Sequence, residues 1–434
     1  VADVGGNWNN GFSAGLFYLN ANNDSSNSNS NIGSRLFVLG NYDFVQIFGY
    51  QPIERYLATR QKIFLGKAWL SSTFVSKRRE KKNKVKHHMP KRAGHLYEKM
   101  CERENIKQAI LCAAQNKNKR NEVKHVLAHI DEFTEKIQNT LEKQSYRPSK
   151  YCIRTIYDSR SKKYRQICSL PFYPDQIVFW CVINTIKPVI MRGMYEWCCG
   201  SVPGRGIKLG YRAVKRWLDC DWKNTKYCLK LDIHHFYQSI PHDKLMAAFH
   251  HKIKDAKMLQ LIKTVIDSSP EGLPIGNYTS QWFANFCLEP LDHYIKQDLH
   301  IKRYVRYVDD MVLFSHSKKQ LHKALKTITE YLKGMGLTLK GNYQIFPTKS
   351  RAVDFLGFQF RRGYVKLRKS DFLRLYRQYR KIRKCLKHMK QIQFKTAAGF
   401  ISRLGQLKHC NVYWLRQRIS KDVNIINLKE VIAN

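Results

Sequence analysis

Two apolar segments of the chain carry carboxylates that a fold can bury only at a cost in free energy. YCLKLDIHHFYQSI starts at Tyr227 and holds Asp232, and RYVRYVDDMVLF starts at Arg303 and holds Asp309 and Asp310. Both segments are rich in strand-forming residues, and the second is typical of a hairpin with its acids at or near the turn. An unpaired carboxylate in apolar surroundings is expensive, so something cationic must compensate for these three side chains.

Two kinds of cation could compensate. In a chain with 77 Lys plus Arg residues, lysine or arginine neighbours are one explanation. The other is a divalent metal, because Mg²⁺ prefers oxygen ligands and is commonly held by one or two carboxylates together with substrate phosphates. Two such ions about 4 Å apart can activate an attacking hydroxyl and stabilise the leaving oxygen in phosphoryl transfer. Acids on adjacent strands inside a polycation would suit a nucleotidyl transferase.

The charge balance indicates a polyanionic partner. Lys plus Arg outnumber the 33 Asp plus Glu, which gives a formal net charge of +44, and such a field attracts nucleic acid. An anionic membrane is the competing partner, but the sequence has no apolar run of about eighteen residues and no signal peptide. The 12 cysteines are scattered without a CxxC pair, which is typical of reduced thiols in a cytoplasm.

The composition changes several times along the chain. Residues 1–40 are rich in Asn and Ser, and residues 41–88 lead into SKRREKKNKVKHH, a run of like charge that is typical of a solvated linker. Then LYEKMCERENIKQAILCAAQ and VKHVLAHIDEFTEKIQNTLEKQ repeat apolar residues at three and four, which predicts two amphipathic helices. KYCIRTIYDSRSKKYRQICSL predicts a β-hairpin with a basic tip. An apolar helix is predicted over 174–194 and a basic helix from Lys366. Without a βαβ rhythm, this mixture favours an α+β fold.

The ordered motifs resemble the conserved blocks of reverse transcriptases. LDIHHFYQSI, LPIGNYTSQWFAN, RYVDDMVLF, GLTLK and DFLGFQF occur in the order of those blocks, and with SVPGRG and KYRQI they span about residues 145–365. The resemblance implies a right-hand polymerase with fingers, a palm built on a ferredoxin-like antiparallel sheet plus helices, and a helical thumb. The domains it implies are N-terminal helices and fingers over 89–225, the palm over 226–362 and a basic thumb over 363–434, which includes ISRLGQLKHCNVYWL.

The resemblance also assigns the catalytic centre. Asp232 and Asp309 match the main metal ligands, Asp310 completes the triad, and the carbonyl of Ile233 is a further ligand. The implied cofactor is a pair of Mg²⁺ ions. The implied substrates are deoxynucleoside triphosphates, a template RNA and the RNA/DNA hybrid.

Further residues match the nucleotide and primer sites. Tyr237 corresponds to the bulky aromatic residue under the incoming sugar, where its ring would clash with a 2′-hydroxyl, although an ordinary packed aromatic is the alternative. Arg165, in KYRQI, matches the fingers arginine at the triphosphate, and Lys163 or Lys150 either assists or is solvated. The complete sets are Arg165, Phe236, Tyr237, Ile275, Gly276 and Gln281 for the nucleotide, and Phe355, Leu356, Gly357 and Lys340 for primer and template.

One departure from the common pattern suggests a subtype. Most relatives carry Gln-Gly, followed by Ser-Pro, where this chain reads Ile275-Gly276 and then Ser280-Gln281. This form resembles the reverse transcriptases of diversity-generating retroelements, which copy a template-repeat RNA with errors at adenines and work with a small basic oligomeric accessory protein. Retron, group II intron and defence-associated enzymes, without adenine mutagenesis, are the alternatives. A polar residue at position 275 could reject mispairs that an apolar one accepts.

The opening segment allows three interpretations. It could be a binding module, because GGNWNNG and NIGSRL resemble the end of C-type-lectin-like proteins. It could instead be a low-complexity tail, or the translation of a template repeat. Asn codons begin with two adenines, and Met89 is the first methionine. We therefore predict that residues 1–88 are translated template RNA and spacer, that the working enzyme starts at Met89, and that it is cytoplasmic and encoded by a bacterium or phage. Two other classes stay open: a non-catalytic nucleic-acid-binding protein and a ligand-binding fusion.

Overall fold

The computed structural model describes residues 3–4, 19–20, 92–158 and 163–433. The chain divides into a unit of residues 1–36 and 92–434 and a unit of residues 37–91, and the second unit lies outside the described residues. β1 (Asp3–Val4) pairs antiparallel with β2 (Leu19–Asn20). The remaining residues of segments 1–40 and 41–88, and Met89, the expected first residue of the enzyme, are outside the described part of the chain. The predictions for these segments therefore stay predictions.

The N-terminal segment contains several helices, one of them strongly apolar. They are α2 (Leu96–Cys101), α3 (Arg103–Ala114), α4 (Asn121–Ala128), α5 (Ile130–Glu142) and α6 (Ile177–Gly193). α5 buries Phe133, Ile137 and Leu141, which recur every four residues on one face. α6 is mostly apolar and packs against α2 and α3. The two helices predicted before residue 145 are each divided in two, because the backbone leaves the helical conformation at Glu102 and at His129.

The predicted β-hairpin is present. β3 (Cys152–Asp158) pairs antiparallel with β4 (Lys163–Ser169), and Tyr157 lies opposite Tyr164. Side chains alternate between the two faces of a strand. Ile156 and Ile167 therefore lie on one face and pack with Ile275, whereas the two tyrosines are exposed. The basic tip, residues 159–162, lies outside the described residues.

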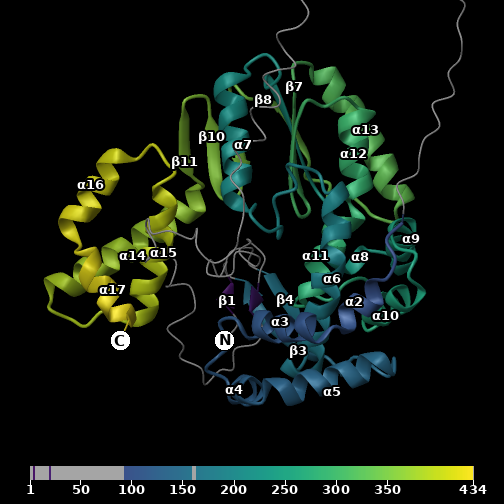
Figure 1. The fold of residues 1–434 in the computed structure, drawn as a ribbon. Helices are drawn as coiled ribbons and strands as arrows, with labels where there is room; N and C mark the ends of the chain where they lie inside the picture. Colours follow the sequence, from purple (N-terminus) through teal and green to yellow (C-terminus); the bar gives the residue numbers. More distant parts are fainter. Residues whose placement is uncertain (1–2, 5–18, 21–91, 159–162, 434) are drawn as a thin grey trace, which may run out of the picture. The chain divides into compact units, whose positions relative to one another are not determined.

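A four-stranded antiparallel sheet carries the carboxylates. Its strands are β5 (Tyr227–Asp232), β6 (Arg303–Tyr307), β7 (Asp310–Ser315) and β8 (Gln344–Pro347), in the spatial order β6-β7-β5-β8. α13 (Lys318–Gly334) packs against β5, β7 and β8, and α7 (Ile207–Cys220) packs against β6 (Figure 1). The helices between β5 and β6 are α8 (Phe236–Ser239), α9 (His242–Lys252), α10 (Ala256–Ile266), α11 (Tyr278–Cys287) and α12 (Glu289–Gln297). The chain thus follows the β-α-β-β-α-β order of a ferredoxin-like sheet.

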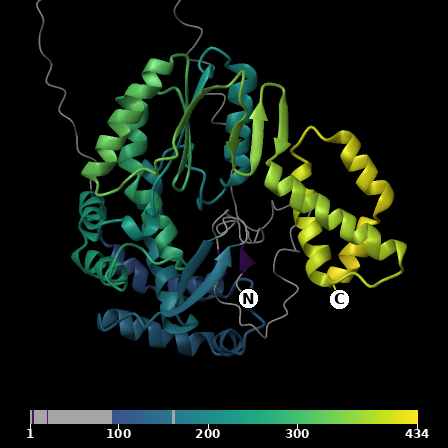
Figure 2. The same ribbon diagram turned by 180° about the vertical axis from the view of Figure 1, so that it is seen from behind.

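A three-stranded sheet leads into the C-terminal helices. β9 (Val353–Phe355), β10 (Phe358–Arg361) and β11 (Tyr364–Leu367) are antiparallel. They are followed by α14 (Lys369–Lys387), α15 (Phe394–Leu407), α16 (Tyr413–Asp422) and α17 (Ile425–Ala433) (Figure 2). The basic helix expected from Lys366 begins at Lys369, because Tyr364–Leu367 pairs with β10. The expected domain boundary at residue 362 falls inside the β10–β11 hairpin.

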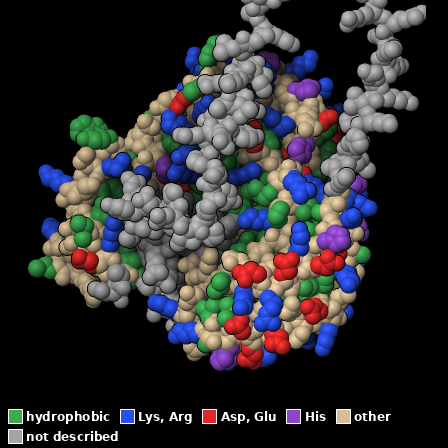
Figure 3. Space-filling model, in the orientation of Figure 1, with side chains coloured by type: hydrophobic (Ala, Val, Ile, Leu, Met, Phe, Trp, Pro, Cys, Tyr) green, Lys and Arg blue, Asp and Glu red, His purple; other side chains and the backbone are tan. Residues whose placement is uncertain are grey.

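Helices and antiparallel sheets together confirm the predicted α+β class, while the division into fingers, palm and thumb stays a prediction. Within 92–158 and 163–433, no helix combines the length and the apolar character needed to cross a membrane. All 12 cysteines are free thiols. On the face seen in Figure 3, acidic side chains gather among basic ones in the region of α4 and α5.

Candidate active site

The three carboxylates meet where two strands of the four-stranded sheet end. Asp232 is the last residue of β5, and it lies opposite Asp310, the first residue of β7. Asp309 lies in the turn between β6 and β7, where Tyr307 pairs with Asp310. Strand register therefore brings together acids that are far apart in the sequence, as the apolar patterns predicted.

A buried arginine supports the turn that presents Asp309. Val308 has a φ of 56°, which is strained for a β-branched residue. Arg306 Nη1 donates a hydrogen bond to the Val308 carbonyl (2.9 Å), and Arg306 Nε and Nη2 bond the Asp292 carboxylate at 2.8 and 2.6 Å. Both Arg306 and Asp292 are fully buried. The sequence analysis missed this pair, although a single arginine between apolar residues in RYVRYV was a usable signal.

Lysines compensate for part of the carboxylate charge. Lys340 Nζ lies 2.7 Å from Asp232 Oδ2, and Lys230 Nζ lies 3.5 Å from Asp310 Oδ2. The lysine alternative is thus realised for one oxygen of each acid. The second oxygen of each, Asp232 Oδ1 and Asp310 Oδ1, is buried without a hydrogen-bond partner. A buried carboxylate oxygen without a partner is costly, so each acid retains an unused ligand position.

The environment opposes ionisation of the two hairpin acids. Burial, followed by the charge of Asp232, raises the pKa of Asp309 from 3.8 to about 8. Burial also raises the pKa of Asp310 from 3.8 to about 6, although nearby Lys230 acts in the opposite direction. A cation placed among these oxygens would favour their ionised forms.

Two of the three carboxylates, Asp232 and Asp309, border a cavity of about 730 Å³. Strands β3 and β4 form one wall, and the loop before α11 forms another. The predicted residues that line the cavity are Arg165, Asp232, Ile233, Phe236, Tyr237, Ile275, Gly276, Gln281, Asp309 and Lys340. The structure therefore gathers the predicted metal and nucleotide residues in one place, while their individual roles stay predictions.

A glycine fixes the contact between the hairpin wall and the loop before α11. Gly276 has a φ of 129°, and a Cβ there would lie 2.2 Å from the Cys168 carbonyl oxygen. Next to it, the Ile275 carbonyl accepts a hydrogen bond from the Cys168 N–H (2.8 Å). The Ile275 side chain is half-buried against Ile156 and Ile167. Position 275 is thus an apolar part of the cavity wall.

Other predicted nucleotide residues have protein partners. Arg165 Nε lies 3.2 Å from Asp158 Oδ2, so the arginine is held at the cavity by its own hairpin. Burial, and then the charge of Asp309, raises the pKa of Tyr237, whose carbonyl accepts a hydrogen bond from the Leu273 N–H (2.7 Å). Phe236 is almost completely buried.

The predicted primer residues form the tight turn between β9 and β10. Leu356 and Gly357 both have positive φ, 54° and 86°, as a two-residue hairpin turn of the primed type requires. Phe355 and Leu356 are buried, so their side chains pack inside the protein and only the backbone of the turn can contact a ligand. Lys340 lies at Asp232, away from this turn. Contact with a primer stays a prediction for all four residues.

The carboxylates fit divalent metal only with help from another ligand. In the part of the chain that the structure describes, no group of three His, Cys, Asp or Glu side chains forms a ready-made metal site. Unpaired Asp232 Oδ1 and Asp310 Oδ1 nevertheless supply oxygen ligands. This arrangement suits Mg²⁺ that is completed by substrate phosphates.

Residues 154–360 match the family described as "Reverse transcriptase (RNA-dependent DNA polymerase)". The retron Ec73 reverse transcriptase of Escherichia coli is 32% identical over 207 residues, which cover 45% of this chain and 59% of the relative. The group II intron-encoded protein LtrA of Lactococcus lactis is 24% identical over 213 residues, which cover 47% of this chain and 34% of the relative. Thus the chain spans 59% or less of these relatives.

Solved structures give a weaker likeness. Apo telomerase from Candida tropicalis has a TM-score of 0.45 and 12% identity, covering 66% of this chain and 58% of that chain. The sequence comparisons and the ordered carboxylate motifs agree on the family. Residues 154–360 match the reverse transcriptases, the RNA-dependent DNA polymerases, and over less than half of its length the chain is similar to those of retrons and group II introns.

Proposed function

We propose that the chain is an RNA-directed DNA polymerase of the retron or group II intron kind. It extends a DNA primer on an RNA template, uses deoxynucleoside triphosphates and releases diphosphate. The observation that carries the proposal is the placement of Asp232 and Asp309 at the border of a large cavity, with Asp310 paired to Asp232 across the sheet, inside a segment that matches the reverse transcriptase family. The relatives in Escherichia coli and the free thiols support a bacterial cytoplasmic location.

Each wall of the cavity has a role in this proposal. Asp232, Asp309 and Asp310, with the Ile233 carbonyl, hold two Mg²⁺ ions. When bound, Mg²⁺ would neutralise phosphate charge and lower the pKa of the attacking hydroxyl. Arg165 faces the triphosphate across the cavity, where its guanidinium can bind phosphate oxygens in pairs.

The other walls shape the nucleotide site. Tyr237 lies under the sugar and excludes a 2′-hydroxyl. Ile275 and Gly276 leave an apolar surface and a close backbone approach beside the new base pair. Because Gly276 lacks a side chain, its loop can lie directly against β4. These residues thus restrict the position of the nucleotide without taking part in the chemistry.

Primer extension on an RNA template tests the proposal. Asp309→Asn keeps the size of the side chain and removes its charge, so we expect extension to fall by about a hundredfold to a thousandfold, the usual cost of removing one electrostatic catalytic group. Asp298→Asn is the matched control, because Asp298 is exposed beyond the end of α12. Equal extension by both variants would rule out a polymerase that works through these carboxylates.

A second candidate function is that of a diversity-generating retroelement. The apolar Ile275 wall favours it, since loss of one hydrogen bond worth about 1 kcal/mol relaxes discrimination several-fold. In this form the enzyme copies a template-repeat RNA with adenine errors, and its partner is a small basic oligomeric protein. The relatives reported above are retron and group II intron enzymes, so they support the first candidate.

Sequencing of the cDNA separates the two candidates. If the second candidate holds, the parent chain makes frequent errors opposite template adenines, and Ile275→Gln makes at least several-fold fewer. Ile275→Val is the control, because it keeps the wall apolar. A parent chain with equal error rates at all four template bases belongs to the retron or group II intron kind.

A further inference from the structure

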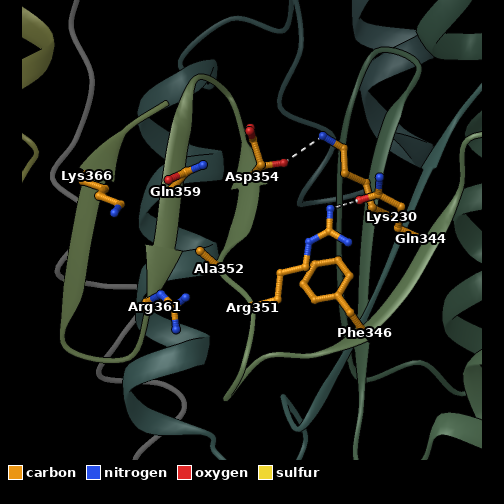
Figure 4. Close-up of a pocket in the computed structure, with 9 residues that line it drawn as sticks. All are labelled: Lys230, Gln344, Phe346, Arg351, Ala352, Asp354, Gln359, Arg361 and Lys366. Atoms are coloured by element: carbon orange, nitrogen blue, oxygen red, sulfur yellow. Dashed lines mark hydrogen bonds between the residues drawn. The ribbon is translucent and has the colours of Figure 1, made fainter. Parts of the chain in front are cut away.

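A second cavity, of about 260 Å³, lies between the four-stranded sheet and the three-stranded sheet (Figure 4). Lys230 and Phe346 reach it from the first sheet, and Asp354, Gln359 and Lys366 reach it from the second. None of these residues belongs to the predicted metal or nucleotide sites. The cavity is therefore a separate feature of the fold.

Strand register explains why polar side chains line it. Asp354, Gln359 and Lys366 lie opposite one another across β9, β10 and β11, so they form a row on one face of the sheet. The other face of the same sheet is apolar and buried, with Val353, Phe355, Phe358, Phe360, Val365 and Leu367. On the first sheet, Lys230 lies opposite Gln344. Two polar faces thus meet where two packed sheets usually bury apolar side chains.

The cavity is strongly cationic. Lys230, Arg351, Arg361 and Lys366 line it with one carboxylate, Asp354. That carboxylate is already bound by Arg368 Nε, at 2.8 and 3.0 Å from its two oxygens. Four cations close together repel one another unless an anion joins them.

Hydrogen bonds to neutral groups position Lys230, Arg351 and Arg361, and Lys230 Nζ also lies 3.5 Å from Asp310 Oδ2. Lys230 Nζ donates to the Asp354 carbonyl oxygen (2.7 Å), and Arg351 Nη2 donates to Gln344 Oε1 (2.7 Å) (Figure 4). Arg361 Nη2 donates to the Ser350 carbonyl (3.2 Å). Among the described residues, no carboxylate forms an ion pair with Arg351, Arg361 or Lys366. Their charges are positioned but not neutralised.

We propose that this cavity binds a phosphate group. A water molecule takes about 30 Å³, so 260 Å³ holds a phosphate group and several waters. Guanidinium and ammonium groups are the usual protein ligands of phosphate. The phosphate belongs either to the backbone of a bound nucleic acid or to free diphosphate, the other product of polymerisation.

The position of the cavity favours the nucleic acid, an assignment that rests on the proposed function. Lys230 precedes Asp232 by two residues on the same face of β5, which is about 7 Å along a strand. A hybrid with its 3′ end at the carboxylates therefore brings backbone phosphates near the cavity, because successive phosphates of one strand are about 3.4 Å apart along the helix axis. The cavity would hold the hybrid in register with the catalytic centre.

Equilibrium binding of an RNA/DNA hybrid to the full chain, at several salt concentrations and without nucleotides, tests the proposal. Arg361→Gln/Lys366→Gln removes two cations from the cavity. We expect weaker binding and a plot of log affinity against log salt that is less steep by about 1 to 2, since each phosphate contact contributes about 0.9. Lys323→Gln/Lys326→Gln is the matched control, because both lysines are exposed on α13. We expect its salt dependence to equal that of the parent chain.

A second measurement identifies the source of the phosphate. If the cavity binds free diphosphate, addition of diphosphate raises the melting temperature of the parent chain more than that of Arg361→Gln/Lys366→Gln. In that case the parent chain and the variant bind the hybrid with equal affinity. Lys366→Gln alone is included because the Arg361 contacts with backbone carbonyls also support a loop. If neither hybrid binding nor diphosphate stabilisation changes in either variant, the phosphate site is overturned. Neither assay requires catalysis, so a failure here is distinct from loss of primer extension in Asp309→Asn.

Discussion

At the scale of single residues, the turn that presents Asp309 depends on Arg306, whose charge no solvent reaches. Arg306 bonds both oxygens of Asp292, the Asn285 amide oxygen and the Val308 carbonyl. It therefore satisfies the buried acid and closes the strained turn before Asp309 at the same time. Breaking a buried ion pair leaves one charge uncompensated, which costs more than the pair contributes.

We predict that Arg306→Met destabilises the chain by about 3 to 5 kcal/mol and lowers its melting temperature, measured by circular dichroism. Arg303→Met is the control three residues earlier on β6. Arg303 bonds Asp221 at 2.7 Å, but its side chain is 37% exposed, so we expect a loss of about 1 kcal/mol or less. Similar losses from both variants would contradict a special role for the buried pair.

At the scale of elements, the cavity is defined by how closely the β3–β4 hairpin approaches the loop before α11. Gly276 sets this distance, because its left-handed backbone and lack of Cβ let the Cys168 carbonyl lie next to it. The contact brings Arg165 and Ile275 to the border of one cavity. A shift of the hairpin would therefore move the proposed triphosphate ligand.

We predict that Gly276→Ala lowers primer extension about tenfold or more, because backbone strain of about 1 to 3 kcal/mol must be relieved by moving the hairpin. Gly334→Ala is the control, since a Cβ at Gly334 has no neighbour within 4 Å and alanine favours the helix. Steady-state extension rates of both variants on one primer–template measure the difference. A Gly276→Ala enzyme with parental rates would show that the hairpin contact is not needed.

Elements were predictable from the sequence where their signals are local. The hairpin around residue 160 and the strands with Asp232 and Asp309 follow from alternating apolar residues, and the ordered motifs identified the family. The ion pairs of Lys340 and Lys230 with the carboxylates were not predictable, because they depend on the register between strands far apart in the chain. The cationic cavity was missed for the same reason: Lys230 and Lys366 alternate with apolar residues on different sheets.

At the scale of the whole molecule, the three clustered carboxylates are a destabilising element within a basic protein. The formal net charge of +44 attracts nucleic acid and opposes compaction through self-repulsion. Yet Asp232 Oδ1 and Asp310 Oδ1 have no hydrogen-bond partner. The positive charge of the protein therefore stabilises these oxygens less than a direct ion pair would. The chain therefore keeps a few acids poorly compensated, as the proposed metal site requires.

This arrangement predicts how stability depends on pH. The pKa of Asp309 is raised to about 8 and that of Asp310 to about 6, from 3.8. The folded chain thus keeps protons that the unfolded chain has lost, and the contribution of these acids to the free energy of unfolding falls as pH rises from about 4 to about 8.

We predict that Mg²⁺ raises the melting temperature more at about pH 8.5 than at about pH 6, because only the ionised acids bind it. Asp309→Asn removes one of these charges, so its metal-free form should lose less stability over this pH range and gain less from Mg²⁺. Equal Mg²⁺ stabilisation of the parent chain at both pH values, or of parent and variant at pH 8.5, would place the metal elsewhere on the molecule.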